Sequence, residues 1–195
     1  MNRKVVEDGW IIWEPNFIGG SESDEYFDYF LNELPWSGGM IKIFGKEFEI
    51  PRKQVFMSDD NLTYAYSGKS LTQSPWDDRV LTLKDKIEKS CKHEFNACLA
   101  NLYRDGQDSN GWHSDNEKEL GVDPVIASLS FGATRKFDLR HNTTKEKLTF
   151  DLSHGSLIIM GGALQHHWKH QVPKTKRVDE ARVNLTFRKL LKQKV

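Results

Sequence analysis

The chain has 195 residues, of which 37% are hydrophobic and 29% charged, and its 28 Lys and Arg balance 28 Asp and Glu. This is the composition of a soluble globular protein, and it excludes a disordered chain. Zero net charge argues against a protein that holds nucleic acid through bulk positive charge, although it allows local basic patches. The length favours one domain with a substantial core.

The N-terminal residues include basic side chains but no apolar segment, so we expect no secretory signal. No apolar run approaches transmembrane length. Cys91 and Cys98 could pair, but without a secretory signal free thiols in a reducing compartment are the better interpretation. We therefore predict a cytoplasmic protein, or a nuclear one if the source is eukaryotic, without a membrane partner and monomeric.

The N-terminal part is predicted to contain a strand, a helix and a hairpin. Residues 5–17 are rich in β-branched and aromatic residues, which is typical of a strand. A helix should follow as far as about Leu34, with Ser21 or Ser23 as its N-cap. Residues 41–50 then predict two short strands that flank a tight turn.

A second helix is predicted behind Ser74 and Pro75, with the serine as the cap and the proline at the first helical position. One side of this helix should carry Trp76, Val80, Leu83 and Ile87, and the helix should end near Cys91.

After Phe95 nearly every pattern indicates strands. The candidates are residues 95–103, 125–131, 135–139, 147–152, 156–160 and 182–188. Short strands at close spacing after two helices indicate an α+β fold, a double-stranded β-helix or jelly roll with supporting helices on one side. No repeat or linker divides the chain, so residues 1–195 are expected to form a single domain.

His113 and Asp115 are candidate metal ligands. Residues two apart on an extended backbone point the same way, so both side chains could bind one ion. His170 would complete the two imidazoles and one carboxylate of non-haem Fe(II) oxygenases. His166 and His167 compete for the third place, and spacing does not decide between them. A His and an Asp that are merely solvated near a loop would give the same weak pattern.

The last predicted strand has one polar face and one apolar face. Arg182, Asn184, Thr186 and Arg188 alternate with Val183, Leu185 and Phe187. Buried arginines would need an anion, and a small dicarboxylate fits because guanidinium groups bind carboxylates in pairs. The alternative is an outer face whose arginines lie in water.

Several motifs together resemble the AlkB family of Fe(II)- and 2-oxoglutarate-dependent dioxygenases, from about Ile43 onward. The branch that they resemble most is the one that repairs DNA. The motifs are Asn101-x-Tyr103-x-Asp105-Gly106, His113-x-Asp115, Ser130-Phe131-Gly132 with Arg135, His154-Gly155-Ser156-Leu157, His170 followed by Pro173, and Arg182-Val183-Asn184-Leu185-Thr186-Phe187-Arg188.

This resemblance implies a site for each cofactor. Fe(II) would be held by His113, Asp115 and His170, which settles the choice among the three nearby histidines. The co-substrates would be 2-oxoglutarate and O2. The implied 2-oxoglutarate residues are Asn101, Tyr103, Arg182, Asn184, Thr186 and Arg188, with the arginines at the carboxylates. Residues of about 40–90 would form an N-terminal nucleotide-recognition segment, and about 95–190 the jelly-roll catalytic core.

The resemblance also implies contacts with an extruded base. Tyr64 and Tyr66 would line the base pocket, since a flipped base is held between aromatic planes. Asn116 and Glu117 would contact the base edge, and a carboxylate there would favour a positively charged methylated base. The alternatives are ordinary strand core for the tyrosines and a solvated loop for Glu117.

Two further residues are implied at the entrance. Arg52 would lie at the pocket mouth, and Phe44 would fill the gap that a flipped base leaves in a duplex. A hairpin side chain folded onto the core is an equally good interpretation of Phe44. Basic residues that could follow phosphates are Lys42, Lys46, Arg52, Lys53, Arg135, Lys136, Arg140, Lys174, Lys176 and Arg177.

The implied function is that of an oxidative demethylase acting on alkylated DNA. It would repair bases such as 1-methyladenine and 3-methylcytosine and release succinate, CO2 and formaldehyde. The alternatives are the same oxidation on RNA and a jelly-roll module that binds nucleic acid without turnover. The candidate iron ligands and arginines argue against the last alternative, because a binding module needs none of them.

Overall fold

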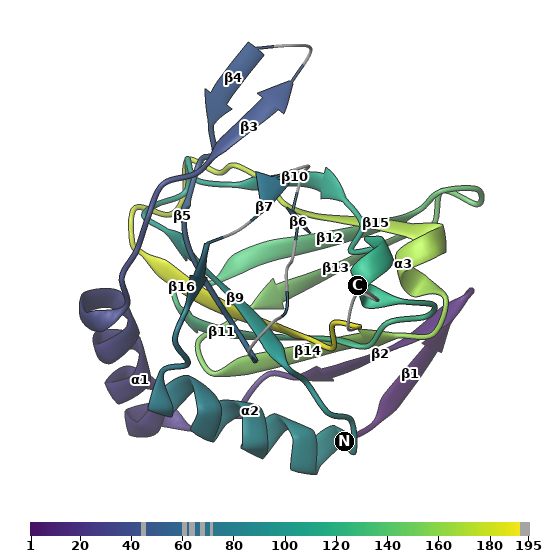
Figure 1. Cartoon of the computed structure of the whole chain (residues 1–195). Helices are drawn as coiled ribbons and strands as arrows, with labels where there is room; N and C mark the ends of the chain where they lie inside the picture. The colour runs from purple at the N-terminus through teal and green to yellow at the C-terminus, as the bar shows by residue number, and fades with distance from the viewer. Residues whose placement is uncertain (44–45, 60–61, 63–64, 67–68, 71, 192–195) are drawn as a thin grey trace.

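The computed structural model describes residues 1–43, 46–59, 62, 65–66, 69–70 and 72–191. Two β-sheets face each other, and the helices α1 and α2 cover the outer face of the larger one (Figure 1). This arrangement confirms the predicted α+β class. The roles of residues 40–90 and 95–190 as separate regions stay predictions.

The larger sheet has eight strands in the order β1-β2-β14-β11-β16-β9-β5-β8. Among the described residues, neighbouring strands of this sheet pair antiparallel, except β5 and β8, which are parallel. The strands are β1 (Arg3–Val6), β2 (Gly9–Glu14), β5 (Lys53–Ser58), β8 (Gln73–Ser74), β9 (Ala97–Tyr103), β11 (Ile126–Gly132), β14 (Ser156–Gly161) and β16 (Arg182–Arg188).

The smaller sheet has the order β10-β15-β12-β13 and lies over the other face. Its strands are β10 (Asn110–His113), β12 (Arg135–His141), β13 (Lys147–Leu152) and β15 (Trp168–Val172). Two hairpins complete the strands. They are β3 (Met40–Ile43) with β4 (Lys46–Glu49), which projects from the body, and β6 (Ala65–Tyr66) with β7 (Lys69–Ser70) (Figure 1).

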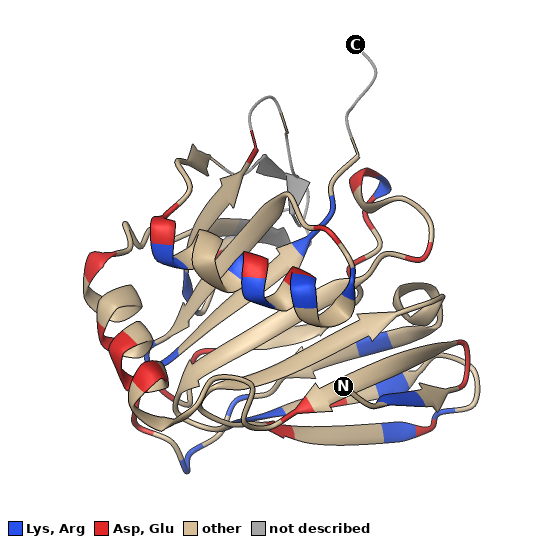
Figure 2. Ribbon diagram, turned by 90° about the horizontal axis from the view of Figure 1, so that it is seen from below, with Lys and Arg blue, Asp and Glu red and all other residues tan. Residues whose placement is uncertain are grey.

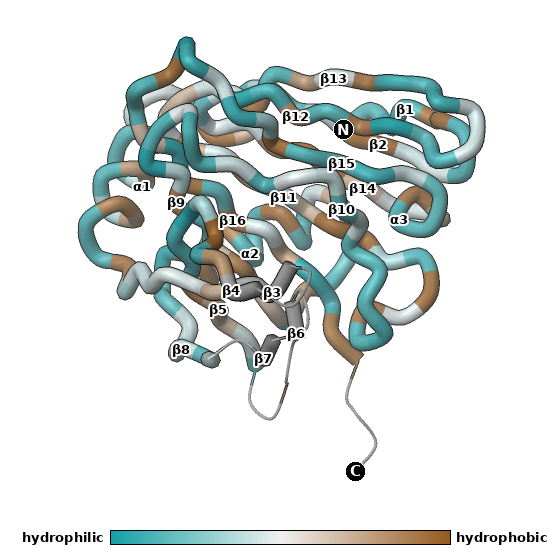
Figure 3. Tube along the Cα trace, turned by 90° about the horizontal axis from the view of Figure 1, so that it is seen from above, coloured by the Kyte–Doolittle hydropathy of each residue, from teal (hydrophilic) through white to brown (hydrophobic). Residues whose placement is uncertain are grey.

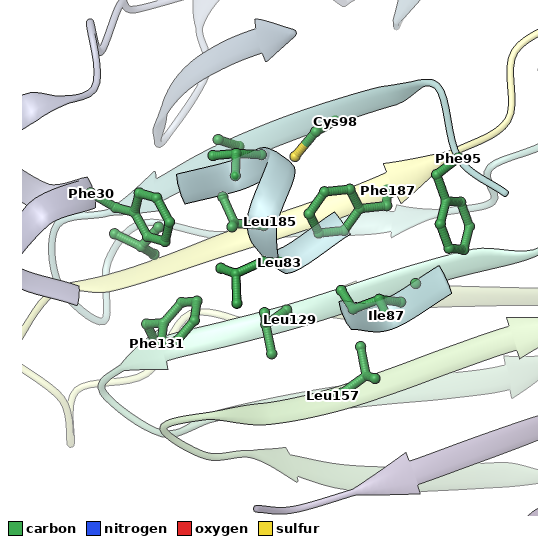
Figure 4. Close-up of a cluster of buried hydrophobic side chains, with 14 of the residues drawn as sticks. Phe30, Leu83, Ile87, Phe95, Cys98, Leu129, Phe131, Leu157, Leu185 and Phe187 are labelled. Carbon is green, nitrogen blue, oxygen red and sulfur yellow. The ribbon is translucent and has the colours of Figure 1, made fainter. Parts of the chain in front are cut away.

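The helices are α1 (Gly20–Glu33), α2 (Asp78–Cys91), the single-turn α3 (Leu164–His167) and the 3-10 turn η1 (Lys118–Leu120). Val80, Leu83 and Ile87 of α2 are fully buried, as their helical spacing predicted. They pack with Leu129 of β11 and Leu185 of β16 into the core between helices and sheet (Figure 4).

A second core fills the space between the two sheets. Leu99 of β9, Ile126 of β11 and Met160 of β14 meet Phe137 of β12 and Trp168 of β15 there. Each long strand of the larger sheet is therefore buried on both faces. Figure 3 shows the hydrophobic stretches concentrated in these interior strands and the hydrophilic ones toward the periphery.

Three local predictions in the N-terminal half are wrong: one concerns a strand and two concern helix N-caps. The segment 5–17 is not one strand but the β1–β2 hairpin, whose turn holds Asp8 at a φ of 59°. The helix α1 has Gly19 as its N-cap, and the Ser23 hydroxyl donates to the Ile18 carbonyl instead of capping. The helix α2 is capped by Asp77, whose carboxylate accepts from the amides of Arg79 and Val80.

Ser74 belongs to β8, so it cannot cap α2, and Trp76 lies ahead of the helix while still packing on the core. An Asp carboxylate at the N-cap also stabilises the helix dipole, which favours Asp77 over Ser74 as the start. The β3–β4 hairpin and the bounds of β13 and β16 were predicted correctly.

Both cysteines are free thiols, Cys98 buried and Cys91 half-buried, as predicted. Burial raises the pKa of the Cys98 thiol and so keeps it protonated. Within the part of the chain that the structure describes, the helices are all too short or too polar to cross a bilayer. The compartment and the monomeric state stay predictions.

Candidate active site

The three predicted metal ligands come together where the smaller sheet meets the loop after β10. His113 ends β10 and lies opposite His170 of β15, so their rings stand 4.2 Å apart between centroids. Asp115 follows two residues later, and its Oδ1 is 3.9 Å from His113 Nε2. One ligand atom from each of the three residues lies within 4.8 Å of the others.

The competing histidines point elsewhere. His166 Nε2 lies 3.5 Å from Asp123, and His167 Nδ1 lies 3.5 Å from Asp8. Residues of β15 alternate in direction, which turns His170 inward and leaves Lys169 exposed. The sheet register therefore selects His170, as the resemblance implied.

The protonation of the three groups suits a divalent cation. His113 Nδ1 is 2.7 Å from the Gly111 carbonyl, so Nδ1–H donates there and Nε2 keeps its lone pair. Burial lowers the pKa of His113, and burial together with the nearby His113 lowers that of His170 to about 3. Both imidazoles are then neutral near pH 7, the form that binds metal.

Asp115 supplies the negative charge. Burial alone would raise its pKa, but Arg188 and the two imidazoles outweigh burial and lower the pKa to about 2. Arg188 Nη2 donates to Oδ2 over 2.8 Å, and the Asp115 amide donates to Gln165 Oε1 over 2.9 Å. Oδ1 is buried and finds no hydrogen-bond donor among the described residues. The set therefore fits Fe(II) with open coordination positions.

A cavity opens beside these ligands, between the two sheets. All six residues implied for 2-oxoglutarate line it. Strand pairing brings them together, because Asn184 lies opposite Asn101 and Arg182 opposite Tyr103 on β16 and β9. The lining residues are Leu99, Asn101, Tyr103, Asn110, His113, Asp115, Ile126, Ser128, Phe137, Leu152, Met160, His170, Val172, Arg182, Asn184, Thr186 and Arg188.

The polar face of β16 is buried, so the alternative of arginines in water is wrong. Arg182 is 1% exposed, and of its guanidinium only Nη2 has an acceptor, Ser130 Oγ at 2.8 Å. Burial lowers the pKa of Arg182 to about 10, which leaves the group charged at pH 7. Its guanidinium lies 5.1 Å from the Tyr103 ring. A buried cation with two unfilled donors suits a carboxylate.

Neighbouring polar side chains are already tied to each other. Asn184 Nδ2 donates to Ser128 Oγ and to the Leu129 carbonyl, and Thr186 Oγ1 donates to Asn184 Oδ1. Asn101 Oδ1 accepts from Arg52 Nε and Gln54 Nε2. These contacts hold the cavity wall in one arrangement without using the Arg182 donors.

Two basic residues have internal roles. Arg52 is 5% exposed and donates to Asn101 and to the Ser109 carbonyl, so its role at the pocket mouth stays a prediction. Arg135 donates to the carbonyls of Asp105, Asp108 and Pro173 and is 1% exposed. Arg135 therefore fixes the loop before β10, and its suggested role in following phosphates is wrong.

The structure describes only some of the residues that the resemblance implies as base contacts. Asn116 is exposed and Glu117 half-buried, directly after Asp115. Phe44 and Tyr64 lie outside the described residues, and of Tyr66 only its place in β6 is described. Their roles stay predictions.

Sequence reasoning missed several residues of the site. Ser128 and Ser130 are polar positions on the inward face of β11, and strand alternation alone could have found them. Asn110, 3.2 Å from His113 Nε2, and Gln165, which fixes the Asp115 amide, carry no such signal because their contacts depend on chain folding.

A second cluster of possible ligands, Asp8, His141 and His167, has the wrong tautomer for a metal. His141 Nδ1 accepts from the amides of Thr143 and Thr144, so its proton is on Nε2 and is donated to Asp8 Oδ2 at 2.9 Å. The cluster instead ties the β1–β2 turn to β12.

Comparisons with known proteins agree with this geometry. A family model described as the 2OG-Fe(II) oxygenase superfamily matches residues 11–188. DNA oxidative demethylase ALKBH2 of Bos taurus is 39% identical over 185 residues, which cover 89% of this chain and 66% of that protein. The chain belongs to the AlkB-like 2OG-Fe(II) oxygenases. The expected cofactors, Fe(II) and 2-oxoglutarate, are those of the family.

A second relative of this AlkB-like oxygenase is the alpha-ketoglutarate-dependent dioxygenase alkB homolog 3 of Bos taurus, 40% identical over 184 residues. The match covers 89% of this chain and 64% of that protein. The chain therefore spans slightly less than two thirds of both cattle relatives. The solved structure of OsALKBH1 covers 96% of this chain and is itself covered completely, with a TM-score of 0.67 and 18% identity. That likeness supports the double-stranded β-helix and nothing finer.

Proposed function

We propose that this AlkB-like oxygenase is an oxidative demethylase of N-alkylated bases in DNA. The observation that carries the proposal is the cluster of half-buried His113 with buried Asp115 and His170, beside a cavity lined by two arginines. With Fe(II), 2-oxoglutarate and O2 bound, the site would supply oxidation of an N-methyl group, and the products would be the restored base, formaldehyde, succinate and CO2.

The chain's own residues would bind and orient the iron and 2-oxoglutarate. His113, Asp115 and His170 would hold the iron on one side and leave the other side open to the cavity. Arg182 and Arg188 would meet the carboxylates of 2-oxoglutarate, and Asn101, Tyr103, Asn184 and Thr186 would complete its binding site. Because the arginines are no more than 4% exposed, water competes little with these contacts.

The base would be held by residues beside the iron ligands. Glu117 lies two residues after Asp115, where its carboxylate would favour the cationic rings of 1-methyladenine and 3-methylcytosine. Tyr64, Tyr66, Asn116 and Arg52 are proposed as further base contacts, and Phe44 as the side chain that fills the gap in a duplex. We assign the contacts of Phe44, Arg52, Tyr64 and Tyr66 to a nucleotide-recognition segment over residues of about 40–90.

One assay separates the candidates. The protein is incubated with methylated DNA or RNA oligonucleotides, Fe(II) and 2-oxoglutarate, and base mass and succinate are followed together. Loss of the methyl mass with matched succinate on DNA is expected, and it should be abolished by Asp115→Ala but kept by Lys89→Ala on the remote helix α2. Faster turnover on RNA would indicate an RNA demethylase instead. Binding of the oligonucleotide without formation of succinate would indicate a nucleic-acid-binding module without turnover.

A further inference from the structure

The outer face of the smaller sheet carries three cations in one row. On β12, Lys136, Asp138 and Arg140 alternate with buried residues and so point outward. Arg140 lies directly opposite Lys147 of β13 on one side and opposite Lys169 of β15 on the other. Lys147, Arg140 and Lys169, which we call the cation row, therefore cross three adjacent strands on the same face.

The acidic residue beside this row on the outer face is Asp138, two residues before Arg140 on β12. Among the residues that the structure describes, none of the three cations forms an ion pair. Asp138 accepts hydrogen bonds from Thr149 Oγ1 and Gln171 Nε2, and it forms no ion pair with the three cations. Like charges directly opposite on a sheet destabilise it. The row is therefore unfavourable for the isolated protein and suits an anion supplied from outside.

The cation row reaches β10, the edge strand that carries the iron-ligand candidate His113. The Arg140 guanidinium lies over the Trp112 ring, 4.8 Å from its centroid, which holds the middle cation in place. Trp112 is 37% exposed and directly precedes the iron-ligand candidate His113. Because β10 is an edge strand, a polymer whose base enters the cavity would pass around this edge to reach Trp112 and the row on the outer face.

Charge is distributed unevenly over the molecule although its net charge is zero. Figure 2 shows acidic residues gathered on α1, on the helical side, while basic residues recur along the strands. An anionic polymer would therefore be repelled by the α1 face and attracted to the strand face.

We propose that the cation row binds the phosphates of a single-stranded nucleic acid, namely the strand that flanks the base held in the active site. Adjacent strands lie about 4.8 Å apart, so the row spans about 10 Å. A positive track next to an exposed aromatic ring is the combination by which proteins hold single strands without reading their sequence. The proposal rests on the proposed function only in taking the bound nucleic acid to be the one whose base enters the active site.

The test is binding of an unmethylated, fluorescently labelled 15-nucleotide DNA strand, followed by anisotropy over a range of salt concentrations. The variant is Lys147→Gln/Lys169→Gln, which leaves Arg140 on Trp112. We expect about five-fold weaker binding at low salt and a salt slope that falls by roughly 1.4, since each phosphate contact on a single strand contributes about 0.7. The melting temperature should stay equal or rise, because like-charge repulsion is relieved.

The matched control is Lys136→Gln, on the same outer face but opposite Asp151, and it should bind the strand like the wild type. Three results would overturn the proposal: an unchanged salt slope in the double variant, a fall in melting temperature that accounts for the lost binding, or equally tight binding of polyglutamate of matched charge.

A second measurement distinguishes failure of this proposal from failure of the proposed function. A methylated trinucleotide is too short to reach the whole row, so the double variant should convert it at the wild-type rate. If the wild type converts no methylated substrate at all, the proposed function fails while the anisotropy result still decides the cation row.

Discussion

Arg188 of β16 donates from Nη2 to Oδ2 of Asp115 over 2.8 Å, and both side chains are no more than 5% exposed. The contact ties the last strand of the larger sheet to the loop that follows β10 of the smaller one. It also directs one carboxylate oxygen to the arginine and leaves Oδ1 free for a metal. The same pair thus joins the two sheets and orients a ligand.

Replacing Arg188 by Ala should destabilise the metal-free protein by about 3–5 kcal/mol, because Asp115 would remain as an uncompensated buried charge. Urea unfolding followed by tryptophan fluorescence measures the loss. The control is Lys189→Ala, which removes an exposed ion pair with Glu94 and should cost much less. Equal losses in the two variants would contradict a buried role for Arg188.

Arg182→Gln should weaken 2-oxoglutarate binding by about 30-fold or more, since truncating one partner of a buried charged pair costs about 2–5 kcal/mol. Mn(II) binding should stay unchanged, because Arg182 bonds to Ser130 and not to the proposed metal ligands. Calorimetry with Mn(II) and then 2-oxoglutarate separates the two steps. A variant that loses Mn(II) affinity equally would place Arg182 at the metal.

Gln165→Leu should lower metal affinity about 10–100-fold, the usual effect of removing a group that orients a ligand. Gln165 Oε1 accepts the Asp115 amide proton, so Gln165→Glu keeps an acceptor there and should restore most of the affinity. Titration with Co(II), followed by its visible absorption, reports both affinity and geometry. Failure of Gln165→Glu to restore the spectrum would show that packing, not the hydrogen bond, is what matters.

Leu83→Ala should destabilise the protein by about 2–5 kcal/mol, because Leu83 is fully buried between α2 and the larger sheet. Its side chain lies on the opposite face of that sheet from the cavity, so the KM for 2-oxoglutarate should not change. Val5→Ala, at an 80% exposed position, is the size-reducing control and should leave stability nearly unaltered. A raised KM in Leu83→Ala would mean that the two cores are coupled.

Glu117→Ala should slow demethylation of cationic bases while metal binding and decarboxylation of 2-oxoglutarate without substrate stay close to wild type. The reason is that a carboxylate near the base favours its charged form without binding the metal. Rates on 1-methyladenine and on a neutral alkylated base, measured side by side, give the selectivity. Parallel loss of metal binding would assign Glu117 to support of Asp115 instead.

Much of the site could be predicted because its signals are local. The alternation of residues 182–188 predicted a polar and an apolar face, and β16 has both. The helical spacing of Val80, Leu83 and Ile87 likewise predicted a buried stripe. These patterns follow from backbone geometry, which sets side-chain direction every two residues in a strand and every three to four in a helix.

Strand pairing between distant segments decided what the sequence by itself left open. Spacing did not choose among His166, His167 and His170, whereas the register of β10 with β15 places only His170 against His113. The partners of Asp115, the internal role of Arg135 and the cation row depend in the same way on which strands are neighbours. The sequence by itself thus determined which faces are apolar, polar or charged. The tertiary structure determined which faces meet, because contacts between separate strands depend on the packing of the whole chain.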